Sequence, residues 1–258
     1  MEHHTAHPAA ARSSVDGPQS DDKPDPFTVV VVLSGGLDST TLLAHYAALG
    51  CDLLAVTVDY GQRHRREIEA ARAVATHYGA RHLVVDLRGF GGLLRGSALT
   101  DAQVQVPDGH YAEESMRATV VPNRNAVLAN VAVSVAVAER ASVVALGMHA
   151  GDHFVYPDCR PAFVTALNSL VAVANEGFPT PQVEAPFIHW TKSDIATHGT
   201  RLGAPLHRSW SCYKGGDRHC GTCGTCYERR EAFRDAGIDD PTDYVDDVTE
   251  FAAPLSGV

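Results

Sequence analysis

Short apolar runs rich in β-branched residues alternate along this chain with stretches whose apolar positions recur at helical spacing. A β-branched run without polar alternation is typical of a strand that is buried on both faces. Such runs predict strands at residues 28–33, 53–58, 82–87 and 142–146. The predicted helices are residues 39–49, 67–77, 126–139, 163–175, 195–202 and 227–236.

This alternation of strands and helices predicts an α/β domain with a parallel sheet. Parallel strands are joined by right-handed crossovers, which place helices on both faces of the sheet. Residues 88–120 have no regular pattern, and we expect loops over the sheet edge there. Residues 1–26 are polar and aperiodic and are predicted to form a disordered tail. The remaining chain divides into an α/β domain at 27–205 and a cysteine-rich segment at 206–258, packed on the same domain.

The composition of the chain restricts which kinds of partner it can bind. The chain has 258 residues, 45% hydrophobic and 20% charged, as in soluble globular proteins. Its formal net charge of −10 argues against a broad basic surface for nucleic acid. No apolar run approaches the roughly 20 residues that span a bilayer, and no secretory signal pattern opens the chain. We therefore expect a cytoplasmic protein without nucleic-acid or membrane partners.

A glycine turn follows the first predicted strand with the sequence Ser-Gly-Gly-Leu-Asp-Ser. Glycines let the backbone approach an oxyanion, and the N–H groups that open the next helix point towards it. Asp38 is unusual in an anion site unless a divalent cation lies between its carboxylate and the phosphates. The turn therefore predicts a nucleotide with Mg²⁺. The residues predicted to contact ATP are Leu33, Ser34, Gly35, Gly36, Leu37, Asp38, Ser39 and Thr40.

Four cysteines lie close together near the C-terminus, in the spacing C-x7-C-x2-C-x2-C. They are Cys212, Cys220, Cys223 and Cys226. Four thiolates in one short loop can close a tetrahedral zinc site, and a site filled by protein ligands favours a structural ion. The alternatives are an iron–sulfur cluster, reduced free thiols and disulfides.

Two polar segments follow predicted strands or precede a predicted helix. Asp59 could contact a ribose, and Gln62, Arg63 and His64 could face phosphate or substrate, because open α/β folds bind ligands at the carboxyl ends of their strands. Arg124 lies at the start of the helix predicted at 126–139, where a nearby anion would offset its charge, so we predict contact with ATP or a substrate carboxylate.

A third segment, between two prolines, has the groups to recognise a base. Tyr156 could stack on a ring, Asp158 could accept hydrogen bonds from a guanine-like edge, and Arg160 could bind a carboxylate. The structural alternatives are a solvated loop for residues 59–64, capping of the predicted helix by Asn123 or Asn125 for the segment around Arg124, and a rigid surface turn for the third segment.

The hexapeptide SGGLDS resembles the phosphate loop of the ATP pyrophosphatases, the PP-loop family. These enzymes bind ATP in a Rossmann-like fold of the adenine nucleotide alpha hydrolase type and transfer AMP to a substrate oxygen. Together the strings SGGLDS, DYGQRH, VPNRN, YPDCRPAF and SCYKGGDRHCGTCGTC resemble one PP-loop family, the 7-cyano-7-deazaguanine synthases of the queuosine precursor pathway. They occur in that family's order and cover residues 29–232.

The resemblance implies an ATP-dependent ligase that converts 7-carboxy-7-deazaguanine and ammonia to 7-cyano-7-deazaguanine (preQ0). It further implies one zinc held by the four cysteines, and a homodimer. The expected course is adenylation of the acid, amide formation, and a second adenylation that ends in the nitrile. The residues predicted to act in catalysis are Asp38, Arg124 and His64.

Two rival functions remain at this stage. A tRNA thiolase of the same superfamily would need a reactive cysteine, for which Cys159 is available. A zinc-bearing module that only binds nucleotide would not need the acidic residue of the loop. The sequence also leaves open whether the product serves tRNA, DNA or a natural product.

Overall fold

The computed structural model describes residues 27–63, 65–101, 103–110 and 116–245. The predicted tail, His64 and the end of the C-terminal segment therefore lie outside the described residues. A five-stranded parallel sheet forms the centre of the molecule, in the order β3-β2-β1-β4-β5. The strands are β1 (Thr28–Val32), β2 (Asp52–Asp59), β3 (Arg81–Asp86), β4 (Val143–Ala145) and β5 (Gln182–Glu184).

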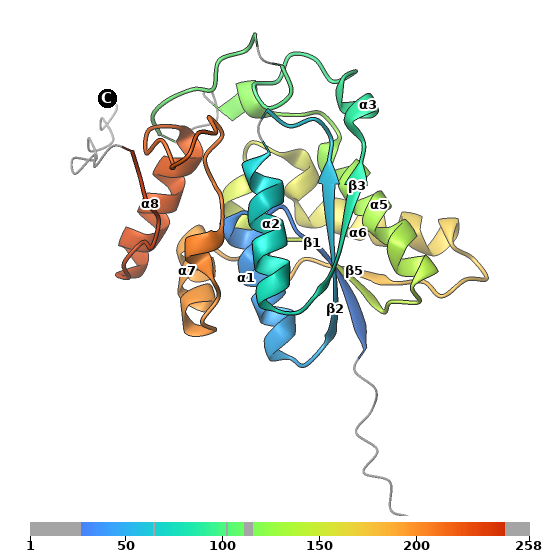
Figure 1. Ribbon diagram of the computed structural model, residues 1–258. Coiled ribbons are helices and arrows are strands. Elements are labelled where there is room, and N and C mark those ends of the chain that lie inside the picture. The colour runs from blue at the N-terminus through green and yellow to red at the C-terminus, as the bar shows by residue number, and fades with distance from the viewer. Residues whose placement is uncertain (1–26, 64, 102, 111–115, 246–258) are drawn as a thin grey trace, which may run out of the picture.

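Helices cover both faces of the sheet, as the alternating pattern predicted (Figure 1). On one face, α1 (Leu37–Ala48), α2 (Arg66–His77) and α7 (Lys192–Arg201) bury their apolar sides against β1 and β2. On the other face lie α5 (Arg124–Ala138) and α6 (Pro161–Ala174). β1 is central, and Val29, Val30 and Val31 are fully buried, which is why that run shows no polar alternation.

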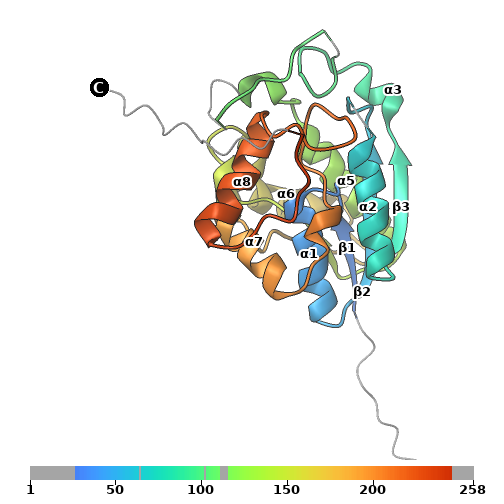
Figure 2. The ribbon, with the colours of Figure 1, turned by 60° about the vertical axis from the view of Figure 1, so that its left-hand side comes forward.

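The C-terminal segment packs beside this sandwich. Helix α8 (Gly224–Ala236) lies against α7, and the view in Figure 2 shows both next to α1. Phe233 and Ala232 of α8 share a core with Leu37, the first residue of α1. Trp210 donates its backbone N–H to the carbonyl oxygen of Gly35 at 2.8 Å. The cysteine-rich segment is thus attached directly to the glycine turn.

Most predicted elements are present, with ends shifted by one to three residues. The sequence pattern missed β5, because only Val183 of its three residues is buried and no apolar run marks it. It also placed the start of the last helix too late: α8 begins at Gly224, so Cys226 lies in its first turn. The irregular region contains the short helix α3 (Arg88–Gly91). The described residues also form four 3₁₀ turns: η1 (Arg117–Thr119), η2 (Ala150–Asp152), η3 (Pro157–Cys159) and η4 (Leu206–Arg208).

One stretch, Arg117–Ala138, is 22 residues long with hydropathy 1.3, so by length and composition it could cross a membrane. Ala129, Ala132 and Ala136 in its α5 part are fully buried in the core beneath the sheet. Small residues on that side let α5 pack closely on β1 and β4. Of the most apolar window of this stretch, 28% is buried, so packing on the sheet accounts for part of its apolar composition.

Candidate active site

A cavity opens at the carboxyl edge of the sheet, where the chain order reverses between β1 and β4. From β1 the chain proceeds outward to β2 and β3 on one side, and later returns to β4 on the other. The loops after these two strands therefore diverge, which leaves the crevice where open α/β sheets bind ligands. This cavity is lined by Val32 at the end of β1, by Leu33 and Ser34 directly after it, and by Leu146 and Gly147 after β4.

The glycine turn is held open by its own hydroxyl groups. Gly35 donates its backbone N–H to Ser39 Oγ at 3.2 Å, and Gly36 donates to Ser34 Oγ at 3.3 Å. The two hydroxyls lie 3.1 Å apart. Helix α1 begins directly after Gly36 and has no side-chain cap. The free N–H groups of its first turn face the cavity, an arrangement suited to an anion.

Gly35 also fixes the turn against α2. Its φ is +88°, and a Cβ atom there would lie 2.3 Å from the carbonyl oxygen of Glu67 and 2.7 Å from the backbone nitrogen of Ala71. Only glycine permits this approach. The first turn of α2 is therefore held at a set position relative to the glycine turn.

Asp38 takes part in a charged network that reaches three other elements. Lys192 Nζ, at the start of α7, lies 2.9 Å from Asp38 Oδ2 and 3.1 Å from Glu228 Oε2. His149 Nε2 lies 3.3 Å from the same lysine nitrogen and 3.4 Å from Asp152 Oδ2. Burial by itself would raise the pKa of Asp38, but Lys192 and His149 bring that pKa below its ordinary value. Asp38 is consequently ionised at neutral pH.

The second carboxylate oxygen of Asp38 shows that this residue fits a cation. Oδ1 is buried and has no hydrogen-bond partner among the described residues. An ionised oxygen without a partner is costly unless a ligand satisfies it. Mg²⁺ prefers one or two carboxylates together with phosphate oxygens, and Asp38 lies beside the predicted phosphate position. His149, Asp152 and Glu228 are a further group whose ligand atoms could hold a metal ion.

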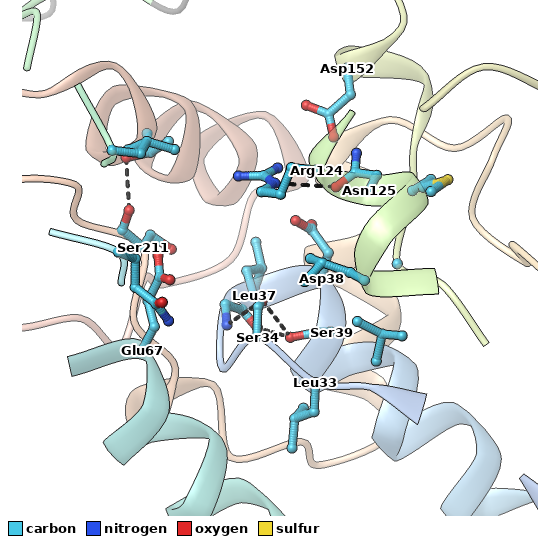
Figure 3. A pocket seen from close by; sticks show the side chains of 18 of the residues that line it. Leu33, Ser34, Leu37, Asp38, Ser39, Glu67, Arg124, Asn125, Asp152 and Ser211 are labelled. Atoms are coloured by element: carbon cyan, nitrogen blue, oxygen red, sulfur yellow. Dashed lines mark hydrogen bonds between the residues drawn. The ribbon is translucent and has the colours of Figure 1, made fainter. Parts of the chain in front are cut away.

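Arg124 brings positive charge to the opposite part of the cavity. It is the first residue of α5 and lines the cavity together with Tyr60, Tyr156 and Tyr213. Figure 3 shows Arg124 and Asn125 entering from the start of α5, and Glu67 and Ser211 from α2 and the cysteine-rich segment. A partly buried guanidinium among aromatic rings can bind a carboxylate next to a flat ring system.

The structure places several predicted contacts on the cavity and others away from it. Ser34, Gly36, Leu37, Asp38 and Ser39 line the cavity with Leu33, Gln62, Arg63, Arg124 and Tyr156. Gly35 and Thr40 do not, because Gly35 faces α2 and Thr40 is fully buried. Asp59 is also buried away from the lining, where it accepts the N–H of Gly61 at 3.1 Å and pairs with Arg65 at 3.5 Å.

The predicted base-recognition segment, residues 156–161, also has some residues on the cavity and others away from it. Only Tyr156 and Cys159 of this segment reach the cavity. Asp158 accepts the backbone N–H of Asn125 at 3.1 Å and so satisfies a donor at the start of α5. Arg160 is exposed and donates to the carbonyl oxygen of His153 at 2.8 Å. These bonds are structural, and the predicted base contacts of Asp158 and Arg160 stay predictions.

Sequence reasoning missed Lys192, Glu67 and Glu228, which all line the cavity. A local signal marks Lys192: Thr191 and Asp194 form a capping box, so the helix starts three residues before the predicted position. Glu67 and Glu228 carry no such signal, since each is one acidic residue in an amphipathic helix. Their role depends on the tertiary arrangement that brings α2 and α8 to the same cavity.

The four cysteines converge as their spacing predicted. Their sulfur atoms all lie within 4.8 Å of one another. A tetrahedral zinc with Zn–S bonds of about 2.3 Å requires sulfurs about 3.8 Å apart, so the cluster is compact enough for the ion. Backbone N–H groups of Cys220 and Thr222 point at Cys212 Sγ and Cys220 Sγ, both at 3.4 Å, and such donors stabilise thiolates. The donor set and geometry fit a metal ion.

The cluster is connected to the cavity through a fully buried arginine. Arg229 Nη1 donates to Ser209 Oγ at 2.8 Å, and Nη2 donates to the carbonyl oxygen of Leu206 at 3.0 Å. Ser211, which lines the cavity, accepts from the same guanidinium at 3.2 Å. Arg229 thus connects α8, which carries Cys226, to the segment that brings Trp210, Ser211 and Tyr213 to the cavity.

Comparisons with known proteins identify the family of this chain. Residues 28–237 match the family described as "Queuosine biosynthesis protein QueC". The chain is 53% identical over 218 residues to the 7-cyano-7-deazaguanine synthases of Brucella ovis and of Brucella suis, covering 84% of this chain and 93% of each relative. A solved structure titled as a predicted subunit of tRNA methyltransferase from Methanocaldococcus jannaschii has a TM-score of 0.45 and 18% identity, over 68% of this chain and 76% of that one. On the strength of the family match and of the 53% identity, this chain belongs to the QueC family.

Proposed function

We propose that this enzyme uses ATP and ammonia to convert 7-carboxy-7-deazaguanine to 7-cyano-7-deazaguanine, through an adenylated acid and an adenylated amide. The single observation that carries the proposal is the cavity in which the glycine turn and the unpartnered oxygen of Asp38 lie together with Arg124. One end of this cavity suits a polyphosphate and the other suits a carboxylate. The relatives that are 53% identical to it over 218 residues are named for this synthase activity.

Activation of the acid is the first chemical requirement. A carboxylate is a poor electrophile, because its oxygens leave badly. In the proposed course a substrate carboxylate oxygen attacks the α-phosphorus of ATP, and pyrophosphate leaves along the glycine turn. The N–H groups of α1 and the ammonium group of Lys192 stabilise the negative charge on the leaving group. AMP on the acyl oxygen then provides a good leaving group.

Magnesium fits the oxygen-rich side of this site. Asp38 would hold it, and the ion would neutralise phosphate charge during adenylation. Arg124 holds the substrate carboxylate near the α-phosphorus, while the rings of Tyr60, Tyr156 and Tyr213 border the flat base. We also retain Gln62, Arg63 and His64 as predicted substrate or catalytic contacts; His64 lies outside the described residues.

The four-cysteine cluster has a structural role in this proposal. A zinc ion held by Cys212, Cys220, Cys223 and Cys226 leaves no open coordination position for a substrate. It would fix the segment that places Ser211 and Tyr213 in the cavity. We keep the division into residues 27–205 and 206–258 as part of this proposal.

The structure disfavours the thiolase alternative. Cys159 is buried, and burial raises the pKa of its thiol well above the ordinary value. A thiolase needs a thiolate nucleophile, whereas this thiol stays protonated and accepts a hydrogen bond from Asn125 Nδ2 at 3.1 Å.

We further propose a cytoplasmic homodimer. Helix α6 and the residues after it expose Leu170, Val173 and Phe178, with 51%, 78% and 66% of their surfaces accessible. An apolar side of this kind gains free energy when a second copy covers it. A reducing compartment suits the four-cysteine cluster, because its thiols must stay reduced to hold a metal.

Product analysis tests the proposed function directly. The metal-replete protein is incubated with 7-carboxy-7-deazaguanine, ATP and ammonium, and the products are identified by mass spectrometry. We expect the nitrile, AMP and pyrophosphate. Asp38→Asn should reduce nitrile formation by roughly 10²-fold or more, since it removes the cation ligand and not the fold. Wild-type protein that consumes no ATP in the presence of the acid and ammonium would overturn the proposal.

A further inference from the structure

Glu67 differs from the other carboxylates that line the cavity. Asp38 and Glu228 bind Lys192, and Asp152 lies beside His149. In contrast, no described residue forms an ion pair with the Glu67 carboxylate or donates a hydrogen bond to it. A partly buried carboxylate without partners costs folding free energy, and nothing in the packing of α2 requires an acid at this position. An acid kept at this position despite its unfavourable free energy indicates a role in binding or catalysis at the cavity.

The backbone of Glu67 is fixed from two sides. The close approach of Gly35 holds its carbonyl oxygen against the glycine turn. The preceding residue, Arg66, donates from Nε to the carbonyl oxygen of Gly216 at 2.9 Å and pairs with Asp217. Glu67 is therefore anchored between the phosphate loop and the cysteine-rich segment, with its side chain on the cavity (Figure 3).

The groups that face Glu67 bring it close to the reacting carbon. They are Arg124 from α5, Tyr60 from the loop after β2, and Tyr213 from the cysteine-rich segment. Arg124 is the group that holds the substrate carboxylate in the proposed function. In the proposed function, the carbon of that carboxylate, which later receives nitrogen, would therefore lie near Glu67.

We propose that the Glu67 carboxylate is the general base that removes protons from the incoming nitrogen, starting with ammonium. The inference rests on the proposed function. Burial raises the pKa of Glu67 to about 7, although Arg124 favours its ionised form. A carboxyl group that is half ionised near neutral pH both accepts and releases protons readily. The tyrosines cannot take this role, since burial raises the pKa of Tyr60 and of Tyr213 above the ordinary value.

In the first half of the cycle the nitrogen gives up two protons and forms one bond to carbon. An N–H bond of ammonium breaks and an O–H bond forms on Glu67, which leaves neutral ammonia with a free electron pair. That pair forms the C–N bond at the acyl carbon, and the C–O bond to AMP breaks, so that AMP leaves with the bonding electrons. Glu67 returns the first proton to water, accepts one further proton from the attached nitrogen to give the amide, and then returns that proton to water as well.

The second half of the cycle needs the same base. After the amide oxygen attacks ATP and pyrophosphate leaves, the carbon bears O–AMP and a protonated imine nitrogen. This nitrogen must lose both of its protons while the C–O bond to AMP breaks and the carbon–nitrogen triple bond forms. A fixed carboxylate beside the nitrogen can accept these protons in turn.

Glu67→Gln tests this role, with Glu69→Gln as the matched control on the exposed side of the same helix. Ammonium needs deprotonation before attack, whereas hydroxylamine is already neutral at pH 7. We measure three rates for each variant: exchange of pyrophosphate into ATP with the acid alone, amide plus nitrile formation with ammonium, and hydroxamate formation with hydroxylamine. Loss of a general base typically costs about 10²–10⁴-fold.

We expect Glu67→Gln to keep pyrophosphate exchange within about twofold and to lose turnover with ammonium by roughly 10²-fold, while hydroxylamine turnover falls by less than about tenfold. Equal losses with the two nucleophiles, or unchanged turnover with ammonium, would overturn the assignment. Should Glu67→Gln fold poorly, Glu67→Asp carries the same test, because it keeps a carboxylate but draws it back by one methylene. Absence of pyrophosphate exchange in the wild-type protein would instead count against the proposed function itself.

Discussion

The ammonium group of Lys192 lies 2.9 Å from one carboxylate oxygen of Asp38 and 3.1 Å from one of Glu228. Three helices, α1, α7 and α8, are thereby joined at their N-terminal ends beside the phosphate loop. Burial by itself would lower the pKa of Lys192, but the two carboxylates raise it above the ordinary value, so the side chain remains a cation. The network thus places a cation beside the glycine turn and joins α1 and α7 to α8.

Lys192→Met should destabilise the fold at pH 7. Removal of one partner leaves two buried carboxylates close together without a cation, which typically costs about 3 kcal/mol in the free energy of unfolding. Addition of Asp38→Asn to Lys192→Met should restore part of this loss, because it removes one of the unpaired charges. Urea unfolding of the two single variants and the double variant measures the coupling. Additivity within about 0.5 kcal/mol would show that the contact has no energetic role.

Cys220→Ser should remove the bound metal and lower thermal stability. With three thiolates in place of four the site no longer holds the metal. The residues around Ser211 are then ordered by protein contacts alone. We expect zinc content to fall from about one to near zero per chain, and the melting temperature to fall by about 10 °C or more. Cys51→Ser is the control, since Cys51 lies outside the cluster. Full zinc content in Cys220→Ser would contradict the proposed ligand set.

Val173→Asp tests the proposed homodimer. Val173 is 78% exposed on the uncovered side of α6, so a charge there does not disturb the core of one copy but is buried at an interface. We expect sedimentation to show a shift from dimer to monomer, with affinity weakened by at least about tenfold. Leu49→Asp changes an exposed apolar residue at the end of α1, which covers the opposite face of the sheet from α6, and should leave assembly unchanged. Wild-type protein that sediments as a monomer would remove the proposal.

The sequence predicted what local pattern determines. The valine run became β1, the glycine turn became the loop before α1, and the four cysteines came together. It could not predict β5, whose residues have no strand pattern of their own and pair with β4 only because the sheet offers an edge. Nor could it show which polar residues point at the ligand: Asp158 follows a promising motif, yet its carboxylate binds the N–H of Asn125. Lys192 and Glu67 belong to the cavity through contacts between helices far apart in the chain.

Glu67→Gln should make the protein more stable at pH 8 but not at acidic pH. Burial raises the pKa of Glu67 from 4.5 to about 7 in the folded state, so the folded protein binds more protons than the unfolded chain between these values. Stability therefore falls as pH rises through this window, and the full penalty is present above pH 7. Replacement by a neutral amide removes the penalty, by about 1–3 kcal/mol at pH 8, and has little effect near pH 4. Urea unfolding of the wild type, Glu67→Gln and Glu69→Gln from pH 4 to 8 measures the difference. A constant difference in stability across that range would mean that the pKa of Glu67 is ordinary in the folded protein. Glu67 would then be almost fully ionised at neutral pH and would hold an accepted proton poorly, which contradicts the role assigned to it.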